Sequence, residues 1–470
     1  MMSQIHPLDL PEIRSRIANS LGRKDLASCA RVCQDWNDSF TPLLYNSIIL
    51  SNHGPSLESV ERNKHLIRHL VIQISIYEEL PSTSSRDQVV SSIMANSSLT
   101  TLNLEHNTIG PEGAQALFKA LKSNSTLTTL NLINSRISSN GIQAIFNALK
   151  TNSTLTTLDL GYNWIGDNGA QALSKALKDN SALTTLNLEY NSIGPQGAQA
   201  LSEALKNSSS LTTLSLEDNE IGPEGAQALF EALKCNSTLT TLNLDNNEIG
   251  PNGTQAMFKV LETNSTLTTL DLGHNSIGDN GAQALSEALE ANSTLTTLNL
   301  SDGNIGPDGA QAVSKDNSIT PNGAQALSEA LKDNSTLTTL NLKYNSIGPD
   351  GAQALSEALK NNSTLTTLNL GDGEIGPDGA QALSEALKTN STLTILHLWQ
   401  NSIGPDGTQA LSEALKTNST LTTLNLDDNE IGPDGAQALS EALKTNSTLT
   451  TLYLGGGGEF NRTQRNSSAI

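Results

Sequence analysis

The stretch LTTLDLGYNWIGDNGAQALSKALKDN (Leu155–Asn180) returns with small changes along most of the chain and decides the fold. Its opening LTTLDL alternates apolar and polar residues, as a short half-buried strand does. The following GDNGAQALSKALKDN places Ala and Leu at the i, i+3, i+4 spacing of an amphipathic helix. Each copy therefore predicts one strand and one helix, with Ile165 closing the core beneath the turn between them.

The strand pattern LxxLxL begins at thirteen leucines, most of them 28 residues apart: Leu99, Leu127, Leu155, Leu183, Leu211, Leu239, Leu267, Leu295, Leu337, Leu365, Leu393, Leu421 and Leu449. One strand and one helix cannot bury an apolar face alone, whereas stacked copies can. Helices are about 10 Å wide and neighbouring strands lie about 4.8 Å apart, so the stack must curve with its strands inside. The sequence thus predicts an α/β horseshoe solenoid with an inner parallel sheet and outer helices.

The ends of each predicted element carry recurring residues. Most helices open with Gly-Pro-x-Gly, and proline suits the first helical turn. They end in Lys-x-Asn, where the asparagine is expected to adopt a left-handed cap. A second asparagine follows the strand, as at Asn107, Asn163, Asn191 and Asn219, and its amide is expected to bond the backbone of the turn. Ser135, Gly303 and Gly373 replace it, which predicts looser turns at those positions.

One copy is irregular, because the step from Leu295 to Leu337 is 42 residues. The half-repeat near 301–336 lacks the end of one helix and a whole strand. We expect the strand at 295–300 to pair directly with the strand at 337–342, since pairing satisfies backbone groups on both edges. The segment SKDNSITPNG should then bulge outward on the helical side, between two helical segments.

The stretch LTTLNLEYNSIGPQGAQALSEALK, which starts at Leu183, resembles the ribonuclease-inhibitor type of leucine-rich repeat, and the resemblance covers residues 99–454. Proteins with this repeat type include inhibitors, innate immune sensors, GTPase activators and ubiquitin-ligase receptors. The resemblance therefore implies a fold and a protein-binding role, but the scaffold does not choose among these classes.

The N-terminal segment does not repeat, and its apolar residues fall at helical spacing in LPEIRSRI and KDLASCARVCQDW. It resembles an F-box, although the spacer between Pro11 and Glu12 is missing and Arg14 stands where leucine is common. LLYNSIIL at 43–50 resembles the segment that joins an F-box to leucine-rich repeats. The resemblance implies docking on a Skp-type adaptor of a cullin ubiquitin ligase through Leu10, Pro11, Ile13, Ile17, Leu21, Leu26, Val32 and Trp36. A plain N-terminal cap for the solenoid is the structural alternative.

These observations divide the chain into four parts. Residues 1–50 form the F-box-like helical head, and 51–98 form a linker with a degenerate first repeat. The solenoid spans 99–454. Residues 455–470 are expected to be disordered.

Charge and composition narrow the class of protein. The formal net charge is -21, and residues 96–458 supply the excess, with 16 Lys and Arg against 37 Asp and Glu. Such repeats should repel phosphate backbones and attract basic protein surfaces, or simply stay soluble. Neither a secretory leader nor a long apolar run is visible, and three cysteines do not make a disulfide framework. We therefore expect a soluble cytoplasmic or nuclear protein that binds neither nucleic acid nor membranes.

Catalytic and metal motifs are absent from the sequence. There is no phosphate-binding GxxxxGK, and Cys29 and Cys33 have no second ligand pair. The NST triplets match a glycosylation acceptor, but without a leader we interpret them as helix caps. We expect no enzymatic activity, cofactor or metal.

If function is binding, it should lie where the copies differ, beside and just after the inner strands. Aromatic residues are scarce, at 3%, yet several fall in this zone. Such residues dominate the energy of many interfaces. The predicted partner-binding concave face comprises Tyr162, Trp164, Tyr190, Asp218, Tyr344, His397 and Trp399.

Together these features favour a substrate-recognition subunit of an SCF-type ubiquitin ligase, with adaptor and cullin as partners and a possibly basic protein substrate. An interaction scaffold without a ligase role is the first alternative. A GTPase-activating protein of the Ran GTPase activator type is the second, and it draws attention to Arg136, the lone arginine between residues 96 and 458.

Overall fold

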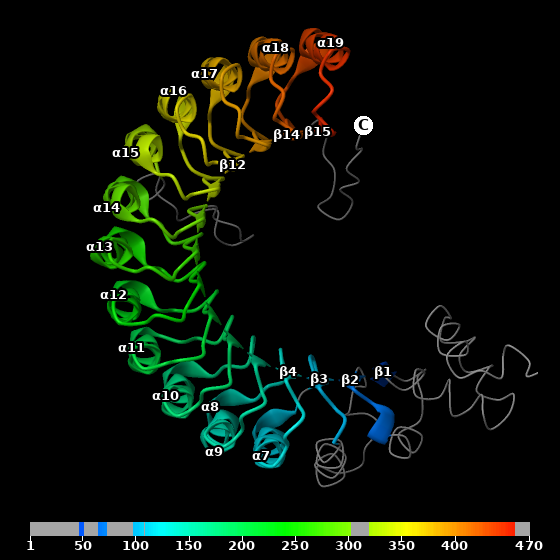
Figure 1. The fold of residues 1–470 in the computed structure, drawn as a ribbon, viewed down its shortest axis with the longest axis vertical. Helices are drawn as coiled ribbons and strands as arrows, with labels where there is room; N and C mark the ends of the chain where they lie inside the picture. The colour runs from blue at the N-terminus through cyan, green and yellow to red at the C-terminus, as the bar shows by residue number, and fades with distance from the viewer. Residues whose placement is uncertain (1–46, 51–63, 73–96, 108, 302–318, 456–470) are drawn as a thin grey trace, which may run out of the picture. The chain divides into compact units, whose positions relative to one another are not determined.

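The computed structural model describes residues 47–50, 64–72, 97–107, 109–301 and 319–455. The chain divides into an N-terminal unit that ends at Asn191 and a C-terminal unit that begins at Ser192. In each unit, short strands lie side by side in chain order and form a parallel sheet, and helices cover one face of that sheet (Figure 1). This is the leucine-rich repeat solenoid that the periodicity predicts.

In the N-terminal unit, the strands are β1 (Ser47–Leu50), β2 (His69–Ile72), β3 (Thr101–Asn103), β4 (Thr129–Asn131), β5 (Thr157–Asp159) and β6 (Thr185–Asn187). Its helices are the short 3-10 helix η2 (Lys64–Leu66), α7 (Gly110–Leu121), α8 (Ser138–Ile142), α9 (Ile145–Leu149) and α10 (Gly166–Leu177). The sequence predicted a degenerate first repeat within residues 51–98, and β2 lies in that range. The sequence did not predict β1, which lies within residues 1–50 and pairs in parallel with β2.

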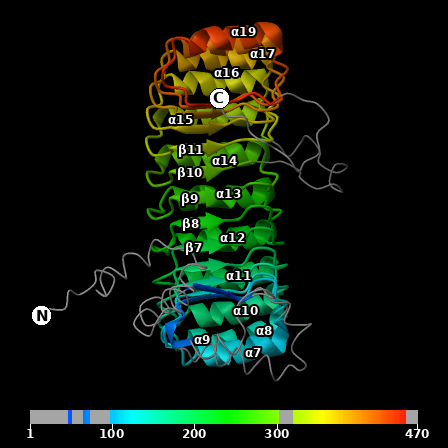
Figure 2. The ribbon, with the colours of Figure 1, turned by 90° about the vertical axis from the view of Figure 1, so that its right-hand side faces the viewer.

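In the C-terminal unit, the strands are β7 (Thr213–Ser215), β8 (Thr241–Asn243), β9 (Thr269–Asp271), β10 (Thr297–Asn299), β11 (Thr339–Asn341), β12 (Thr367–Asn369), β13 (Ile395–His397), β14 (Thr423–Asn425) and β15 (Thr451–Tyr453). The helices are α11 (Pro195–Leu205), α12 (Gly222–Leu233), α13 (Gly250–Leu261), α14 (Gly278–Ala291), α15 (Pro321–Asp333), α16 (Gly348–Leu359), α17 (Gly376–Leu387), α18 (Gly404–Leu415) and α19 (Gly432–Leu443). Figure 2 shows these helices as successive layers, one per repeat.

The core of each repeat is leucine-based. In the repeat that begins at Leu155, the strand leucines Leu155, Leu158 and Leu160 are fully buried, as is Ile165, which confirms its predicted place. Burying a side chain of this size stabilises the fold by about 1.5–3 kcal/mol. Middle leucines of neighbouring strands lie in register, as Leu158 does with Leu186, so each repeat completes the core of the next.

A first row of buried asparagines joins neighbouring repeats through the loop that follows each strand. Asn163 is fully buried, and its amide donates to the carbonyls of Leu132 (2.8 Å), Leu160 (3.0 Å) and Gly161 (2.9 Å). Its Oδ1 accepts from the backbone of Ser135 and Ile137, both at 3.1 Å. The other buried members of this row include Asn191, Asn219, Asn247, Asn275, Asn345, Asn401 and Asn429.

Ser135 replaces this asparagine without losing the bond between repeats. Its buried hydroxyl donates to the Leu104 carbonyl at 3.0 Å, the place that an asparagine amide would take. The loose turn predicted at Ser135 is therefore wrong. Gly373 has no such group, and Gly303 lies outside the described residues.

A second row of asparagines occupies the loop between helix and strand. The amide of Asn152 donates to the carbonyls of Leu121 (3.0 Å) and Asn124 (2.9 Å), so it caps the end of α7 in the preceding repeat. Its Oδ1 accepts from the backbone of Thr154 (3.1 Å) and Leu155 (2.8 Å). The expected left-handed cap is wrong, because the described asparagines of this row do not have positive φ. The amide nitrogen of Asn152 is also the atom to which a glycan would attach, and it is engaged inside the fold.

The irregular copy is bridged as predicted, because β10 pairs directly with β11, with Thr297 opposite Thr339. The described part of the chain resumes with Ile319 and Thr320, immediately before α15. Asp279, in the first turn of α14, accepts from the Thr320 backbone (2.9 Å), the Thr320 hydroxyl (2.6 Å) and the Gly323 backbone (3.0 Å). Residues 302–318, which include the first half of the predicted bulge, lie outside the described residues. The second half is described and does not bulge, because Ile319 is buried and Pro321 to Gly323 form the first turn of α15.

Candidate partner-binding surface

The loop from strand to helix carries two recurring positions with left-handed backbone, one on each side of the buried asparagine. The first position holds His106, Asn134, Tyr162, Tyr190, Asp218, Asn246, His274, Tyr344, Asp372, Gln400 and Asp428. The second holds Arg136, Trp164, Ser192, Glu248, Ser276, Glu374, Ser402 and Glu430. The sequence analysis found these positions by their variability but had no means of predicting their backbone conformation.

The left-handed backbone conformation is less costly for some residue types than for others. A side chain with a Cβ atom costs roughly 1–2 kcal/mol there, and Asn and Asp tolerate the conformation best. Tyr162, Trp164 and Tyr190 adopt φ values of 58°, 52° and 52°. Backbone geometry therefore does not explain why these positions hold large aromatic side chains.

These three residues of the N-terminal unit form what we call the N-terminal aromatic patch. Tyr162, Trp164 and Tyr190 are 37%, 57% and 51% exposed, and they are the most exposed aromatic residues in the described part of the chain. The rings of Tyr162 and Tyr190 stack at a centroid distance of 4.5 Å and an angle of 13°. The patch therefore presents a large apolar surface to solvent.

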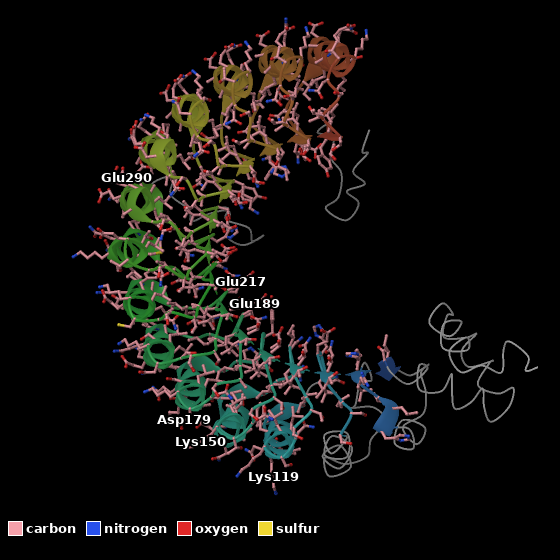
Figure 3. All side chains as sticks on the ribbon, viewed as in Figure 1. Lys119, Lys150, Asp179, Glu189, Glu217 and Glu290 are labelled. Atoms are coloured by element: carbon pink, nitrogen blue, oxygen red, sulfur yellow. The ribbon has the colours of Figure 1, made fainter. Side chains whose placement is uncertain are left out.

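Acidic groups lie on the strand side of the same unit. Asp159 accepts from the backbone of Gly161 at 3.1 Å and also from the Asn187 side chain. Burial, and to a smaller extent the negative charge of Glu105, raises the pKa of the Asp159 carboxyl above its usual value. In Figure 3, Glu189 lies on the strand side, whereas Lys119 and Lys150 lie on the helix side. Acidic residues therefore accompany the N-terminal aromatic patch.

The C-terminal unit holds a second aromatic pair, which is packed differently. Tyr344 and Trp399 meet edge to face at a centroid distance of 5.1 Å and an angle of 77°, and both are half-buried. Trp399 lies over Gly371, where an added Cβ would fall 2.0 Å from the indole nitrogen. The Lys343 ammonium lies 5.2 Å from the centre of the Tyr344 ring. Trp399 thus reaches from its own repeat across the preceding one to contact a third.

His397 belongs to the same repeat, whose strand reads Ile-Leu-His where most strands read Thr-Leu-Asn. The side chain is half-buried, and this burial lowers the pKa of its imidazole below the usual 6.5. A neutral imidazole is consequently favoured at this point of the inner sheet.

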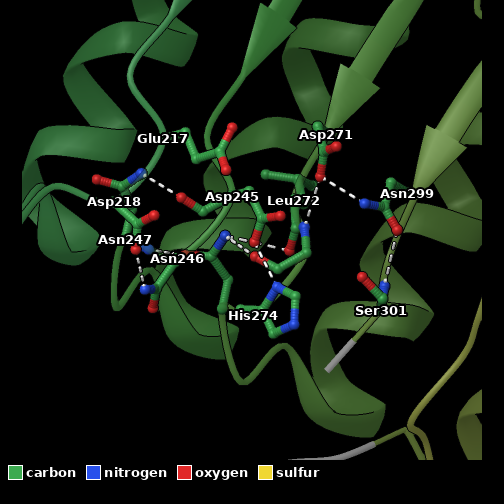
Figure 4. Close-up of polar contacts among 12 residues, drawn as sticks. Glu217, Asp218, Asp245, Asn246, Asn247, Asp271, Leu272, His274, Asn299 and Ser301 are labelled. Atoms are coloured by element: carbon green, nitrogen blue, oxygen red, sulfur yellow. Dashed lines mark hydrogen bonds and ion pairs between the residues drawn. The ribbon is translucent and has the colours of Figure 1, made fainter. Parts of the chain in front are cut away.

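Asp218 lies at the start of a polar network in the C-terminal unit (Figure 4). It accepts from the Asn246 amide, and His274 contacts Asp245 through Nδ1 at 2.6 Å. Burial raises the pKa of Asp271, which accepts from Asn299 at 2.8 Å. Spacing within one copy could not predict the contact of His274 with Asp245, because the partner lies one repeat earlier.

The remaining predicted residues have different locations. Leu10, Pro11, Ile13, Ile17, Leu21, Leu26, Val32 and Trp36 lie outside the described residues. Arg136 is exposed at a left-handed position of the loop. Cys29 and Cys33 also lie outside the described part, and Cys235 is an exposed free thiol. Within the described ranges, none of the helices has the length and apolar character needed to cross a membrane.

Solved structures that are similar to this chain include the following two. Actin-binding site 2 of leiomodin-1 aligns with 34% of this chain and 86% of its own, at 23% identity and a TM-score of 0.28. The Rad7–Elc1 complex from yeast aligns with 80% of this chain and 90% of that chain, at 17% identity and a TM-score of 0.39. No curated protein sequence matches the chain.

The family described as "Leucine Rich repeat" matches twelve segments that together cover more than half of the sequence. These segments are 95–118, 123–146, 151–174, 179–202, 207–230, 235–258, 263–286, 291–314, 333–356, 361–384, 389–412 and 417–440. The twelve matches agree with the strand–helix repeats of the structure. The chain belongs to the leucine-rich repeat family.

Proposed function

We propose that this chain is a receptor that holds a protein partner on its strand-to-helix loops and docks a Skp-type adaptor of a cullin ubiquitin ligase through its N-terminal segment. The observation that carries partner binding is the N-terminal aromatic patch. Its three side chains occupy left-handed positions that disfavour them, and they remain exposed. Exposed aromatic residues of this kind supply most of the binding energy at many protein interfaces.

The adaptor role rests on sequence. Leu10, Pro11 and Ile13, followed by Leu26 and Trp36, resemble the F-box pattern, apart from the missing spacer after Pro11. A short helical segment with few large apolar groups is too small to be stable alone and gains stability by packing against another surface. An adaptor supplies such a surface, and the repeats would then hold the substrate of the ligase.

The test is co-purification of the tagged full chain from cells. Adaptor and cullin subunits should accompany the wild type and should be lost from the Leu26→Ala, Trp36→Ala double variant, because each change removes about 2–5 kcal/mol of apolar contact. Arg14→Leu restores the common F-box residue and is the matched control that should retain or strengthen capture. Absence of an adaptor from the wild type, or equal capture by the double variant, would refute the ligase role.

The same experiment separates the alternative functions. A small GTPase in place of the adaptor would indicate an activator of GTP hydrolysis, and Arg136→Ala would then be the next variant. Protein partners without adaptor or GTPase would indicate an interaction scaffold. Circular dichroism of each variant should show unchanged repeats, so that a lost partner reports a lost contact and not unfolding.

A further inference from the structure

We propose that the N-terminal aromatic patch binds an arginine side chain of the protein partner, with the guanidinium stacked on the exposed tyrosine surface and facing the neighbouring carboxylates. This inference rests on the proposed function, because it names the chemical group by which the partner is held. The inference specifies which chemical group the N-terminal aromatic patch binds, because the fold alone does not.

The geometry of the rings suits a planar cation. Tyr162 and Tyr190 are stacked and parallel to within 13°, so each ring has one face turned away from the other ring, and that face is flat. Guanidinium groups stack on aromatic faces, and they lose less hydration in doing so than an ammonium group loses. Trp164, which is 57% exposed, adds the aromatic side chain that binds cations best.

The charges around the patch favour a cation as well. Asp159 ends strand β5, and Glu105 and Glu189 lie in the loops that follow β3 and β6. Figure 3 shows Glu189 on the strand side and Lys119 and Lys150 on the helix side. The charged group that acts on Asp159 in the described structure is Glu105, which is also acidic. A positive side chain arriving there would offset part of this like-charge repulsion.

The C-terminal unit shows one equivalent position in contact with a cation. Tyr344 occupies the same loop position as Tyr162 and Tyr190, and the Lys343 ammonium lies 5.2 Å from the centre of its ring. An aromatic ring at this loop position can therefore hold a cationic side chain close to it.

The test uses the full chain and a fluorescein-labelled peptide of alternating glycine and arginine, with binding followed by fluorescence anisotropy. The variant combines Tyr162→Asn, Trp164→Ser and Tyr190→Asn. These residues occur at equivalent left-handed positions in this chain, at Asn134, Ser192 and Asn246, so the loop conformation should be retained. The changes do not alter net charge, so any general attraction between a basic peptide and an acidic protein is the same in both proteins. Tyr344→Asn is the matched control.

The triple variant should bind the arginine peptide roughly tenfold more weakly, as loss of aromatic anchors does, while Tyr344→Asn binds like the wild type. The corresponding lysine peptide should bind more weakly than the arginine peptide, and a glutamate peptide should not bind. Equal binding by wild type and triple variant, or equal affinity for arginine and glutamate peptides, would overturn the inference. Capture of a cellular partner that survives such a result would leave the proposed function standing, so the two failures are distinguishable.

Discussion

The two loops of each repeat both contain a buried asparagine, yet they differ in what surrounds it. In the loop from helix to strand, Asn-Ser-Thr recurs almost without change, and the described asparagines keep ordinary negative φ. In the loop from strand to helix, the asparagine is flanked by two left-handed residues whose identity changes from copy to copy. One loop is therefore uniform throughout, while the other combines a fixed centre with variable flanks.

This difference separates residues that hold the solenoid together from residues that are free to acquire a specific contact. Replacing a buried amide that bonds into two repeats is costly, since each unsatisfied buried group costs about 1–3 kcal/mol. The flanking side chains point away from that network and can vary. Positions that vary between the repeats of this chain therefore indicate candidate functional residues, without a comparison with other proteins.

The largest effect is expected from removing an asparagine of the first row. Asn275 donates to Leu244 (2.7 Å), Leu272 (3.1 Å) and Gly273 (2.8 Å), and accepts from two backbone groups. Asn275→Ala should lower the free energy of unfolding by about 3–5 kcal/mol, because several buried groups lose their partners together. Denaturant titration measures the loss.

Two control variants are compared with Asn275→Ala. Asn292→Ala in the other loop leaves fewer groups unsatisfied and should cost about 2–3 kcal/mol. Gln400→Asn, at an exposed flank, should change stability by less than about 0.5 kcal/mol. If Asn275→Ala cost no more than Gln400→Asn, the framework role of the first row would be wrong.

A smaller effect is expected at the C-terminal aromatic pair. Trp399→Ala should destabilise the chain by about 1–2 kcal/mol, because a half-buried indole loses its contacts with Tyr344 and Gly371. Gly371→Ala should cost a similar amount by displacing the indole. The double variant should cost less than the two single costs added together, and a strictly additive result in denaturant titration would contradict the packing of the indole over this glycine.

At the N-terminal aromatic patch, stability should hardly respond. The combined Tyr162→Asn, Trp164→Ser and Tyr190→Asn variant should keep its thermal midpoint within about 2 °C, because exposed side chains contribute little to folding and asparagine tolerates left-handed backbone. Calorimetry measures the midpoint. A fall comparable to that of Trp399→Ala would show that the patch is part of the framework.

The smallest effect concerns Asp159, whose equivalents in neighbouring strands are Asn131 and Asn187. Its pKa is raised in the folded chain, mainly by burial, so its ionisation opposes folding once the pH exceeds the ordinary value of 3.8. Asp159→Asn should therefore stabilise the chain at neutral pH by a few tenths of a kcal/mol. The gain should disappear below pH 3.8, and a gain that persists in acid would have another cause.

Much of the fold could be predicted from sequence because the repeat is nearly exact. The strand leucines, Ile165 and the skip across the half-repeat followed from spacing and from the need to pair strand edges. The strand β1 could not be predicted, because Ser47–Leu50 is stabilised by pairing with β2 and not by a repeat motif of its own. The helix of one copy is split into α8 and α9, with Ala144 bonded to Gly141 in a tighter turn, and periodicity gave no sign of this.

The candidate surface was predicted less completely. Variability singled out Tyr162, Tyr190, Tyr344 and Trp399, yet it treated the four alike. Their difference depends on contacts between repeats: Trp399 reaches the Tyr344 ring because Gly371, one repeat earlier, has no side chain. Spacing within one copy does not contain such information.

Gly373 weakens one joint of the C-terminal unit against mechanical load. Its backbone N–H donates to Oδ1 of Asn401 at 2.9 Å, but it has no amide with which to bridge back to Leu342, as Asn401 bridges back to Leu370 at 2.8 Å. Under a pulling force along the stack, this joint carries load through strand pairing, helix packing and the indole of Trp399. Stretching of single molecules in an optical trap should therefore rupture the joint between β11 and β12 before the asparagine-bridged joints on either side of it, at a force that Trp399→Ala lowers and that changes at more distant joints leave unaffected.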